Sequence, residues 1–190
     1  MKKNLITAFL MTIATTILLG IVYPLVVYGL SQGIFRDKAN GQIIVRNGEA
    51  VGSRLIAQPF TGAKYFHPRP SAAGNGYDAT NSGGTNLAST NQKLIDRVKA
   101  DAKSLHDENP ATLVPVDLLT TSASGLDPEI SPAAAEFQVP RVARERGLTE
   151  TAVRDLVQKH TRQRDLGLLG EPRVNVLELN LELDDVSAKH

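Results

Sequence analysis

The 190-residue sequence carries 21 Lys and Arg against 20 Asp and Glu, and it contains no Cys and no Trp. A charge balance this even gives no basic surface of the kind that binds phosphate backbones, so nucleic acid is not expected among the partners. Because there is no Cys, disulfides, thiolate metal sites and cysteine nucleophiles are excluded. The length allows one ordinary domain and an appendage.

The appendage is residues 1–35. Its only charged residues are Lys2 and Lys3, and the stretch from Leu5 to Leu30 is uncharged and largely apolar. About 20 apolar residues suffice for an α-helix to cross a hydrocarbon layer of about 30 Å. A cleaved signal peptide has a shorter apolar region and a small-residue cleavage site, and this stretch is longer and offers no good site. We therefore predict a single transmembrane helix, embedded in membrane lipid, that stays attached.

The orientation of that helix does not follow from counting charges. Lys2 and Lys3 precede it, whereas Arg36 and Lys38 follow it. A short basic tail left inside with a long domain translocated is the more usual arrangement. We therefore expect a cytoplasmic N-terminus, an extracytoplasmic domain formed by residues 36–190, and a location in the plasma (inner) membrane.

Strand signals occur at three places in this domain. Gln42–Arg46 and Glu49–Ala57 flank Asn47-Gly48, the strongest two-residue hairpin signal. A second candidate strand lies within Thr112–Thr121. From Val174 to Leu183, leucines alternate with polar residues, which predicts a strand with one buried face.

Helix signals separate these strands. Apolar residues recur at helical spacing over Leu94–Leu105, with Thr90 or Asn91 as the cap. A second helix is predicted within Ser131–Gly147, and Thr149 caps a third. The fold class is therefore α+β: a single N-terminal transmembrane helix followed by a small extracytoplasmic α+β domain.

Other residue types give weak functional signals. The histidines His67, His106 and His160 are scattered and lack a metal-binding motif, so no metal site is expected. The arginines between Arg141 and Arg164 alternate with acidic residues, which favours solvated helix surfaces.

The segment from His67 to Asn91 consists mainly of Gly, Pro, Ser, Thr, Asn and Asp. A loop of this length inside a domain is usually functional or disordered. Arg69 lies between two prolines that stiffen its backbone. We interpret the segment as a recognition loop ordered by a partner, with surface disorder as the alternative. The predicted partner-binding residues are Tyr65, Phe66, Arg69, Pro70, Tyr77 and Asn86.

A second polar stretch, Thr121–Pro132, raises one enzymatic alternative. Ser122 or Ser124 could serve as the nucleophile of a membrane-anchored extracytoplasmic serine hydrolase. The G-x-S-x-G elbow is absent, and no His or Asp has a spacing that nominates it as a partner. Turn and capping roles account for these residues better.

Several segments together resemble one family, the C subunits of the Kdp high-affinity potassium-transporting P-type ATPases. One departure is Ala57-Gln58-Pro59-Phe60, where the family often has Gly-Gln-x-Phe. The segments that carry the resemblance are Gly52–Phe60, Tyr65–Ala72, Ser82–Leu87, Ser122–Pro132, Gln138–Ala143 and Val174–Leu181.

The resemblance implies an accessory, non-catalytic subunit of an ATP-driven potassium uptake complex. Its implied partners are a channel-like subunit that selects potassium, a P-type ATPase subunit that hydrolyses ATP, and a very small single-span subunit. Potassium is then the transported ion. The chain lacks the phosphorylated Asp-Lys-Thr-Gly sequence of such pumps, so it is not expected to be the ATPase itself.

The resemblance also brings a possible cofactor. The family is described as a catalytic chaperone that raises the ATP affinity of the pump subunit, and Ser82-Gly83-Gly84 is likened to an ABC-type nucleotide signature. The Gly pair lacks the Lys-Ser/Thr of a P-loop. If the domain is extracytoplasmic, it lies away from cytosolic ATP, and an effect on ATP affinity would be allosteric.

Overall fold

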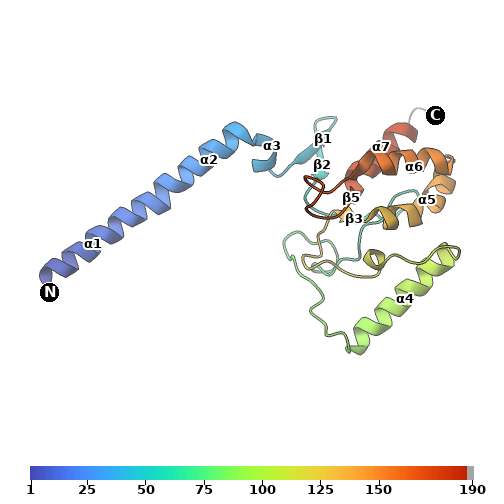
Figure 1. Ribbon diagram of the computed structural model, residues 1–190, viewed down its shortest axis with the longest axis horizontal. Helices are drawn as coiled ribbons and strands as arrows, with labels where there is room; N and C mark the ends of the chain where they lie inside the picture. Colours follow the sequence, from blue (N-terminus) through green and yellow to red (C-terminus); the bar gives the residue numbers. More distant parts are fainter. Residues whose placement is uncertain (188–190) are drawn as a thin grey trace. The chain divides into compact units, whose positions relative to one another are not determined.

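The structure, a computed structural model, describes residues 1–187. Two compact units are present, Met1–Ile43 and the chain from Ile44 onward (Figure 1). The first contains a long apolar helix and the second is a small α+β domain. The predicted fold class, an N-terminal apolar helix followed by a small α+β domain, is confirmed.

The N-terminal helix runs from Lys2 to Ile34 and is long and apolar enough to cross a membrane. It comprises α1 (Lys2–Ile17), a π-helical turn η1 (Leu18–Val22) and α2 (Tyr23–Ile34), and a short helix α3 (Arg36–Ala39) follows. The π-helical turn ends two residues before Pro24, whose ring lacks an N–H and would crowd the carbonyl four residues earlier in a regular α-helix. The wider turn lets the helix continue through the proline.

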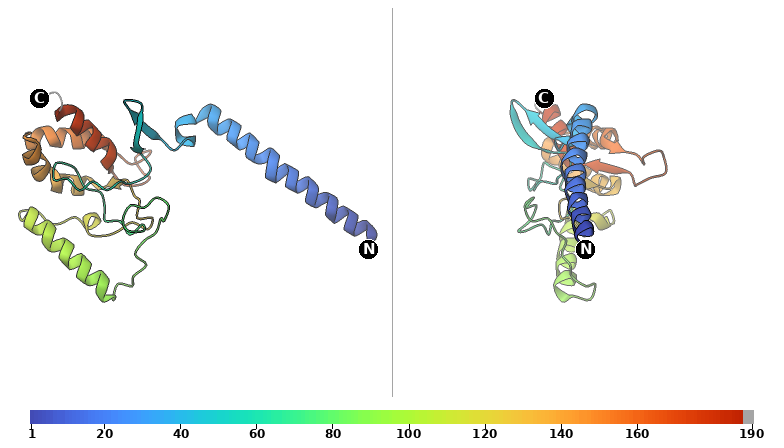
Figure 2. Two further views of the ribbon diagram at one scale, coloured as in Figure 1. Left: turned by 180° about the vertical axis from the view of Figure 1, so that it is seen from behind. Right: turned by 90° about the vertical axis from the view of Figure 1, so that its left-hand side faces the viewer.

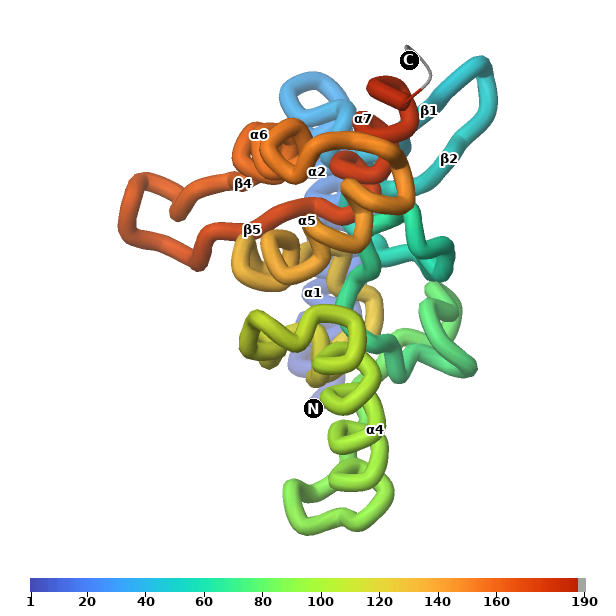
Figure 3. The backbone as a smooth tube through the Cα atoms, turned by 90° about the vertical axis from the view of Figure 1, so that its right-hand side faces the viewer, coloured from blue at the N-terminus to red at the C-terminus, as the bar shows by residue number. Residues whose placement is uncertain are grey.

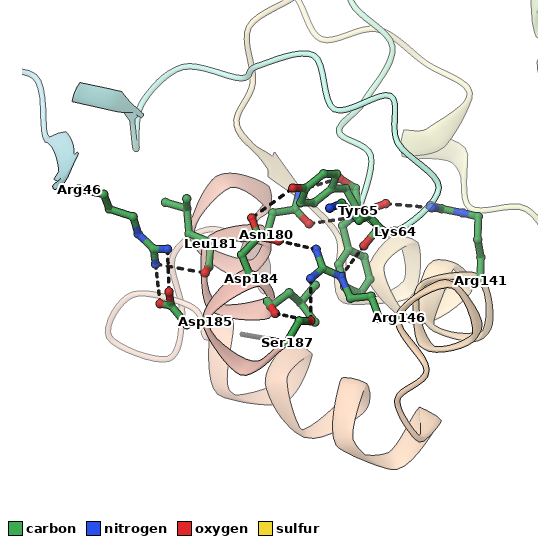
Figure 4. A network of polar contacts seen from close by, with 12 residues as sticks. Arg46, Lys64, Tyr65, Arg141, Arg146, Asn180, Leu181, Asp184, Asp185 and Ser187 are labelled. Atoms are coloured by element: carbon green, nitrogen blue, oxygen red, sulfur yellow. Dashed lines mark hydrogen bonds and ion pairs between the residues drawn. The ribbon is translucent and has the colours of Figure 1, made fainter. Parts of the chain in front are cut away.

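The hairpin predicted around Asn47-Gly48 is confirmed. It pairs β1 (Ile43–Arg46) with β2 (Glu49–Ser53). Asn47 and Gly48 have φ values of 52° and 84°, the positive values that a type I′ turn requires. An ion pair between Arg46 and Asp185 (2.6 Å) attaches β1 to the C-terminal helix (Figure 4).

The second sheet has three short antiparallel strands in the order β3-β5-β4. They are β3 (Glu129–Ile130), β5 (Arg173–Asn175) and β4 (Thr161–Arg162). Val174 of the central strand lies opposite Ile130 on one side and Thr161 on the other. Its side chain is fully buried, so this strand belongs to the core.

The prediction of a strand from Val174 to Leu183 is wrong beyond Asn175. Helix α7 (Val176–Ser187) begins there, and the Asn175 side chain accepts a hydrogen bond from the Glu178 N–H (3.1 Å) as its cap. The alternating leucines fit a helix because α7 is buried over a wide face that includes the polar Asn180. Its buried residues are Val176, Leu177, Leu179, Asn180 and Leu183.

The strand predicted within Thr112–Thr121 is also wrong. The segment contains a 3₁₀ turn, η2 (Val116–Leu118), directly after Pro115. Leu118 is buried, whereas Val116 is 70% exposed. The Asp117 carboxylate accepts hydrogen bonds from the N–H and hydroxyl of Ser131, which ties the turn to the start of the next helix.

The three helices predicted from spacing and caps are confirmed. They are α4 (Gln92–Glu108), α5 (Pro132–Arg146) and α6 (Glu150–His160). Side chains of Asn91, Ser131 and Thr149 each accept a hydrogen bond from a first-turn N–H. Gly147 ends α5 in the left-handed conformation, at φ 65°.

The core lies where α5, α6 and α7 gather around the three-stranded sheet, and α4 lies apart from them (Figures 2 and 3). The side chains of α4 are exposed or half-buried, and Leu105 packs at the edge of the core. The largest fully buried apolar side chains are Phe66, Phe137, Leu179, Leu183, Val139, Val142, Val153 and Val174.

Candidate functional site

Residues 63–69, here called the strap, cross the core between α5 and α7. Two buried amide side chains hold its backbone. Asn180 accepts from the Phe66 N–H (2.8 Å) and donates to the Phe66 carbonyl (2.9 Å). Gln138 accepts from the His67 N–H (2.7 Å) and donates to its carbonyl (3.1 Å). Each amide therefore satisfies both backbone groups of one residue, as a neighbouring strand would.

Arg146 of α5 attaches the same strap to α7 (Figure 4). Its guanidinium donates to the Lys64 carbonyl (2.6 Å), Asp184 (2.9 Å) and Ser187 (2.9 Å). The guanidinium also lies 5.0 Å from the ring centre of Tyr65, whose hydroxyl donates to Asp184 (3.2 Å). The Arg146 side chain is only 3% exposed, so the prediction that it is solvated is wrong.

Arg141 is buried in the same way. It donates to Glu108 (2.8 Å), Gln138 (2.7 Å), the Tyr65 carbonyl (2.9 Å) and the Ala63 carbonyl. The ion pair with Glu108 joins the end of α4 to α5. A planar guanidinium carries five N–H donors, so it can satisfy strap carbonyls that would otherwise be buried without partners.

A recess of about 260 Å³ lies beside this ion pair, between α4 and the strap. Pro70 and His67 line it together with Leu105. Burial, and secondarily the charge of Arg141, lower the pKa of His67 below its usual value. The imidazole is therefore held neutral near physiological pH.

The loop after the strap folds back on the Thr121–Pro132 stretch. Arg69 donates to the carbonyls of Thr120 and Thr121 (both 3.3 Å) and to Asp127 (3.2 Å). The Tyr77 hydroxyl donates to the Arg69 carbonyl (2.8 Å), and burial raises the pKa of Tyr77 to about 12. The stiff Arg69 is thus engaged within this chain.

The His67–Asn91 loop and the Thr121–Pro132 stretch approach each other so closely at Gly125 that this position requires glycine. The Ser71 hydroxyl donates to the Gly125 carbonyl (2.6 Å) and accepts from the Tyr77 N–H (2.8 Å). Gly125 has φ 66°, and a Cβ there would lie 2.6 Å from both the Ala73 nitrogen and the Gly83 carbonyl oxygen. This contact makes the first half of the loop part of the fold.

The six predicted partner-binding residues therefore differ in exposure, and they fall into three groups, buried, exposed and half-buried. Phe66 has no exposed surface, so its ring cannot touch another subunit in this conformation. Asn86 is exposed, with φ 50°. The others, which hold the loop against the domain and are half-buried, are Tyr65, Arg69, Pro70 and Tyr77.

Sequence reasoning missed the connection between β4 and β5. Asp165–Gly170, here called the leucine tip, carries Leu166, Leu168 and Leu169 at 91%, 82% and 62% exposure. Three leucines interspersed with Gly167 and Gly170 are the signal that could have indicated it. It is the most apolar exposed feature of the β4–β5 hairpin.

A family model described as "K+-transporting ATPase, c chain" matches residues 5–185. That range covers the apolar helix and the α+β domain together. The chain belongs to this family.

Curated relatives resemble the chain over nearly its whole length. The Potassium-transporting ATPase KdpC subunit of Koribacter versatilis is 68% identical over 184 residues, covering 97% of this chain and 95% of the relative. The subunit of the same name from Acidobacterium capsulatum is 57% identical, covering 97% and 99%. That of Rhodospirillum rubrum is 52% identical, covering 97% of each.

The ATP attribution to this family can be tested on Ser82-Gly83-Gly84. Phosphates are held by free backbone N–H groups and by basic side chains. Here the Gly83 N–H (2.9 Å) and the Ser82 hydroxyl (3.0 Å) both donate to the Ser124 carbonyl. A Cβ on Gly84 would lie 3.3 Å from the Ala123 carbonyl oxygen. The Gly83 N–H and the Ser82 hydroxyl are therefore engaged within the chain and do not point to a phosphate oxygen in this conformation.

The serines of the hydrolase alternative make the contacts of a turn. The hydroxyls of Ser122 and Ser124 lie 3.2 Å apart, and Ser124 accepts from the Leu126 N–H (3.1 Å). His67 instead contacts the Gly62 carbonyl (3.1 Å), and His160 contacts Glu182. Within residues 1–187, no group of three or more His, Asp or Glu side chains could hold a metal ion.

Proposed function

We propose that this chain is the accessory subunit of an ATP-driven high-affinity potassium uptake complex, where it stabilises assembly and modulates the pump without performing a reaction. The family match over residues 5–185 carries the proposal, because it includes both the apolar helix and the α+β domain. The relatives of this chain are named as subunits of a potassium-transporting ATPase.

The proposed topology places the N-terminus in the cytoplasm. The helix crosses the plasma (inner) membrane and ends by Phe35, and residues 36–190 form the extracytoplasmic domain. Support comes from the uncharged helix and from the basic Lys2 and Lys3 that precede it. The proposed partners are a channel-like subunit, a P-type ATPase subunit and a small single-span subunit.

In this topology the domain and cytosolic ATP lie on opposite sides of the membrane. The domain would raise the ATP affinity of the pump subunit allosterically, by contacting one of its conformational states more favourably than another. The Gly83 N–H and the Ser82 hydroxyl, which both donate to the Ser124 carbonyl, support this indirect mechanism over a nucleotide site in this chain.

Among the six predicted partner-binding residues, Asn86 would make the direct contact, since it lies on the exposed end of the loop. Tyr65, Phe66, Arg69, Pro70 and Tyr77 would support the loop from within. Replacing Asn86 with Gly keeps its positive φ accessible and removes the carboxamide. The Asn86→Gly substitution should lower the potassium affinity of the purified complex, whereas Ser89→Ala should leave it unchanged. Equal potassium affinities in the two variants would show that Asn86 does not contact a partner.

Co-purification tests the assignment. The tagged full-length chain is isolated from native membranes in mild detergent, and retained proteins are identified by mass spectrometry. Recovery of potassium-transporting ATPase subunits supports the accessory role. A chain isolated alone that hydrolyses esters, with activity lost in Ser122→Ala or Ser124→Ala, would establish the hydrolase alternative instead.

Sidedness is tested separately. The sequence has no Cys, so Ser89→Cys on the exposed loop is the chain's only thiol. A membrane-impermeant maleimide should label it from outside sealed right-side-out vesicles. Labelling restricted to inverted vesicles would place the domain in the cytoplasm and reopen a direct encounter with ATP.

A further inference from the structure

The leucine tip projects from the three-stranded sheet as the turn between β4 and β5 (Figure 3). Leu166, Leu168 and Leu169 expose most of their surface. Isolated exposed leucines are common on folded proteins. Three exposed leucines within four residues concentrate apolar surface on one turn, and concentrated exposed apolar surface marks interaction sites.

The tip is held rigidly by its own backbone. Asp165 and Leu169 exchange two hydrogen bonds, of 2.8 and 2.9 Å, and the Leu168 N–H donates to the Asp165 carbonyl (3.2 Å). Leu166 has φ 54°, a left-handed conformation that disfavours a branched apolar side chain. Backbone strain of this kind persists at sites where the surrounding structure enforces it. The backbone that carries the three leucines is therefore tied into a hydrogen-bonded turn.

The charges around the tip are already paired within the chain. Arg164 contacts Glu171 (2.6 Å), and Arg173 contacts Glu129 (3.1 Å) and Asp165 (3.4 Å). A loop that inserts into a lipid surface typically combines aromatic residues with excess Lys and Arg. The leucine tip has no aromatic residue, it contains Asp165, and Arg164 and Glu171 flank it, so basic residues are not in excess. These features favour a protein partner over lipid.

A recess of about 360 Å³ continues this surface from the base of the hairpin. Glu171, Pro172 and Arg173 line one side, and the exposed Val116 lines another. Acidic side chains outnumber basic ones in its lining, with Asp117, Asp127, Glu129 and Glu171 against Arg69 and Arg173. The lining therefore keeps a net negative charge, although Asp127, Glu129 and Glu171 are each paired with an arginine. A complementary partner would place a basic side chain over the recess.

We propose that the leucine tip docks into an aliphatic socket on another subunit of the potassium-transporting ATPase, with a basic residue of that subunit over the acidic recess. The proposal rests on the proposed function, which supplies a multi-subunit complex. It adds a second attachment point, on the α+β domain, to the one provided by the helix. A turn whose backbone is already hydrogen-bonded loses little backbone freedom on docking, which favours a specific interface.

Photo-crosslinking in the assembled complex tests the contact. Leu168→Cys introduces a unique thiol into this chain, to which a benzophenone is attached in native membranes. The expected product is an adduct with an identified subunit of the ATPase. Leu113→Cys is the matched control, because Leu113 is 93% exposed and lies outside the hairpin. A lipid adduct alone, no protein adduct, or the same adduct in equal yield from both positions would overturn the proposal.

A triple variant measures the contribution to assembly. Leu166→Ser, Leu168→Ser and Leu169→Ser together should reduce retention of the chain in the detergent-washed complex by about tenfold or more. The thermal midpoint of the isolated full-length chain should stay unchanged, since these side chains are exposed. If the triple variant is retained in the complex as well as the wild type and its thermal midpoint is unchanged, the docking role is wrong. If its thermal midpoint is lowered, the crosslinking experiment decides between the two outcomes.

The two proposals fail differently. If the wild-type chain co-purifies with ATPase subunits but the tip gives no subunit adduct, the docking role is wrong and the accessory function stands. If the wild-type chain retains no such subunit, both proposals are wrong.

Discussion

Asn180 and Phe66 are 114 residues apart, and the Asn180 carboxamide bonds to both backbone polar groups of Phe66. Asn180 is 1% exposed and Phe66 is fully buried. The strap therefore crosses the core without leaving these backbone groups unpaired. Gln138 repeats the arrangement at His67, so the strap depends on two buried amides from two different helices.

Replacing Asn180 with Leu keeps the volume similar and removes the clamp. The Phe66 N–H and carbonyl would then be buried without partners, at a cost of about 1–3 kcal/mol each. We expect the free energy of unfolding of the full-length chain, measured by denaturant titration in detergent, to fall by about 2–6 kcal/mol.

Asn81→Leu is the control, because Asn81 is exposed. Its effect should stay within about 0.5 kcal/mol. A similar loss in both variants would show that the clamp does not stabilise the strap.

Alanine substitutions at Gly125 and Gly147 distinguish the cost of backbone strain from the cost of a steric clash. Their φ values are 66° and 65°, yet a Cβ on Gly147 meets nothing within 4 Å, whereas one on Gly125 meets two backbone atoms at 2.6 Å. Gly147→Ala should therefore cost about 1 kcal/mol, the strain of a left-handed alanine. Gly125→Ala should cost clearly more and loosen the loop against the turn. Thermal unfolding and protease sensitivity near Ser71 measure both effects, and equal costs would contradict the close approach.

The features predicted correctly are those that local sequence determines. Asn47-Gly48 specifies its turn through two positive φ values, and Asn91, Ser131 and Thr149 cap helices through first-turn N–H groups. Each signal acts within a few residues, so tertiary context does not change it.

The wrong predictions concern residues whose state depends on distant partners. The pattern from Val174 to Leu183 counts Asn180 as solvent-facing, but Asn180 is buried because it clamps Phe66. Arg146 was expected in solvent, yet the strap carbonyl of Lys64 and Asp184 of α7 enclose it. Patterns of alternating polarity and of charge depend only on the side chains of neighbouring residues. They contain no information about a hydrogen-bond or ion-pair partner more than 30 residues away in the sequence.

The candidate site follows the same division. The composition of the His67–Asn91 loop indicated a segment with a special role, but composition could not show that Arg69 and Ser71 bind within the chain. The leucine tip could not be predicted from the sequence because its leucines follow neither helical nor strand periodicity. Only their exposure shows that they are not core residues.

The titration of His67 should make the stability of the domain depend on pH. Burial, and then Arg141, lower its pKa in the folded state below the ordinary 6.5. As pH falls through about 6.5, the unfolded chain therefore binds more protons than the folded one, and stability decreases until the folded pKa is passed. This contribution is fully present above about pH 6.5.

His67→Gln removes this titration and keeps a donor for the Gly62 carbonyl. Between about pH 7 and pH 5, the variant should lose less stability than the wild type in denaturant titrations. His106→Gln, at an exposed position on α4, is the control and should retain the wild-type slope. Identical slopes in the wild type and His67→Gln would show that His67 does not produce the acid sensitivity.

Arg146 and Arg144 test whether a buried guanidinium can be replaced by another cation. Arg146 is 3% exposed and divides its donors among Lys64, Asp184 and Ser187, whereas the Arg144 side chain is 67% exposed. Lysine keeps the charge but has one nitrogen, so Arg146→Lys leaves buried acceptors unpaired and should lower the free energy of unfolding by about 2–4 kcal/mol. Arg144→Lys should change the free energy of unfolding by less than about 0.5 kcal/mol.

Because Arg146 joins the strap to α7, Arg146→Lys should also make the strap sensitive to protease before the chain unfolds globally. An Arg146→Lys variant with wild-type stability and wild-type protease resistance would show that the positive charge alone suffices.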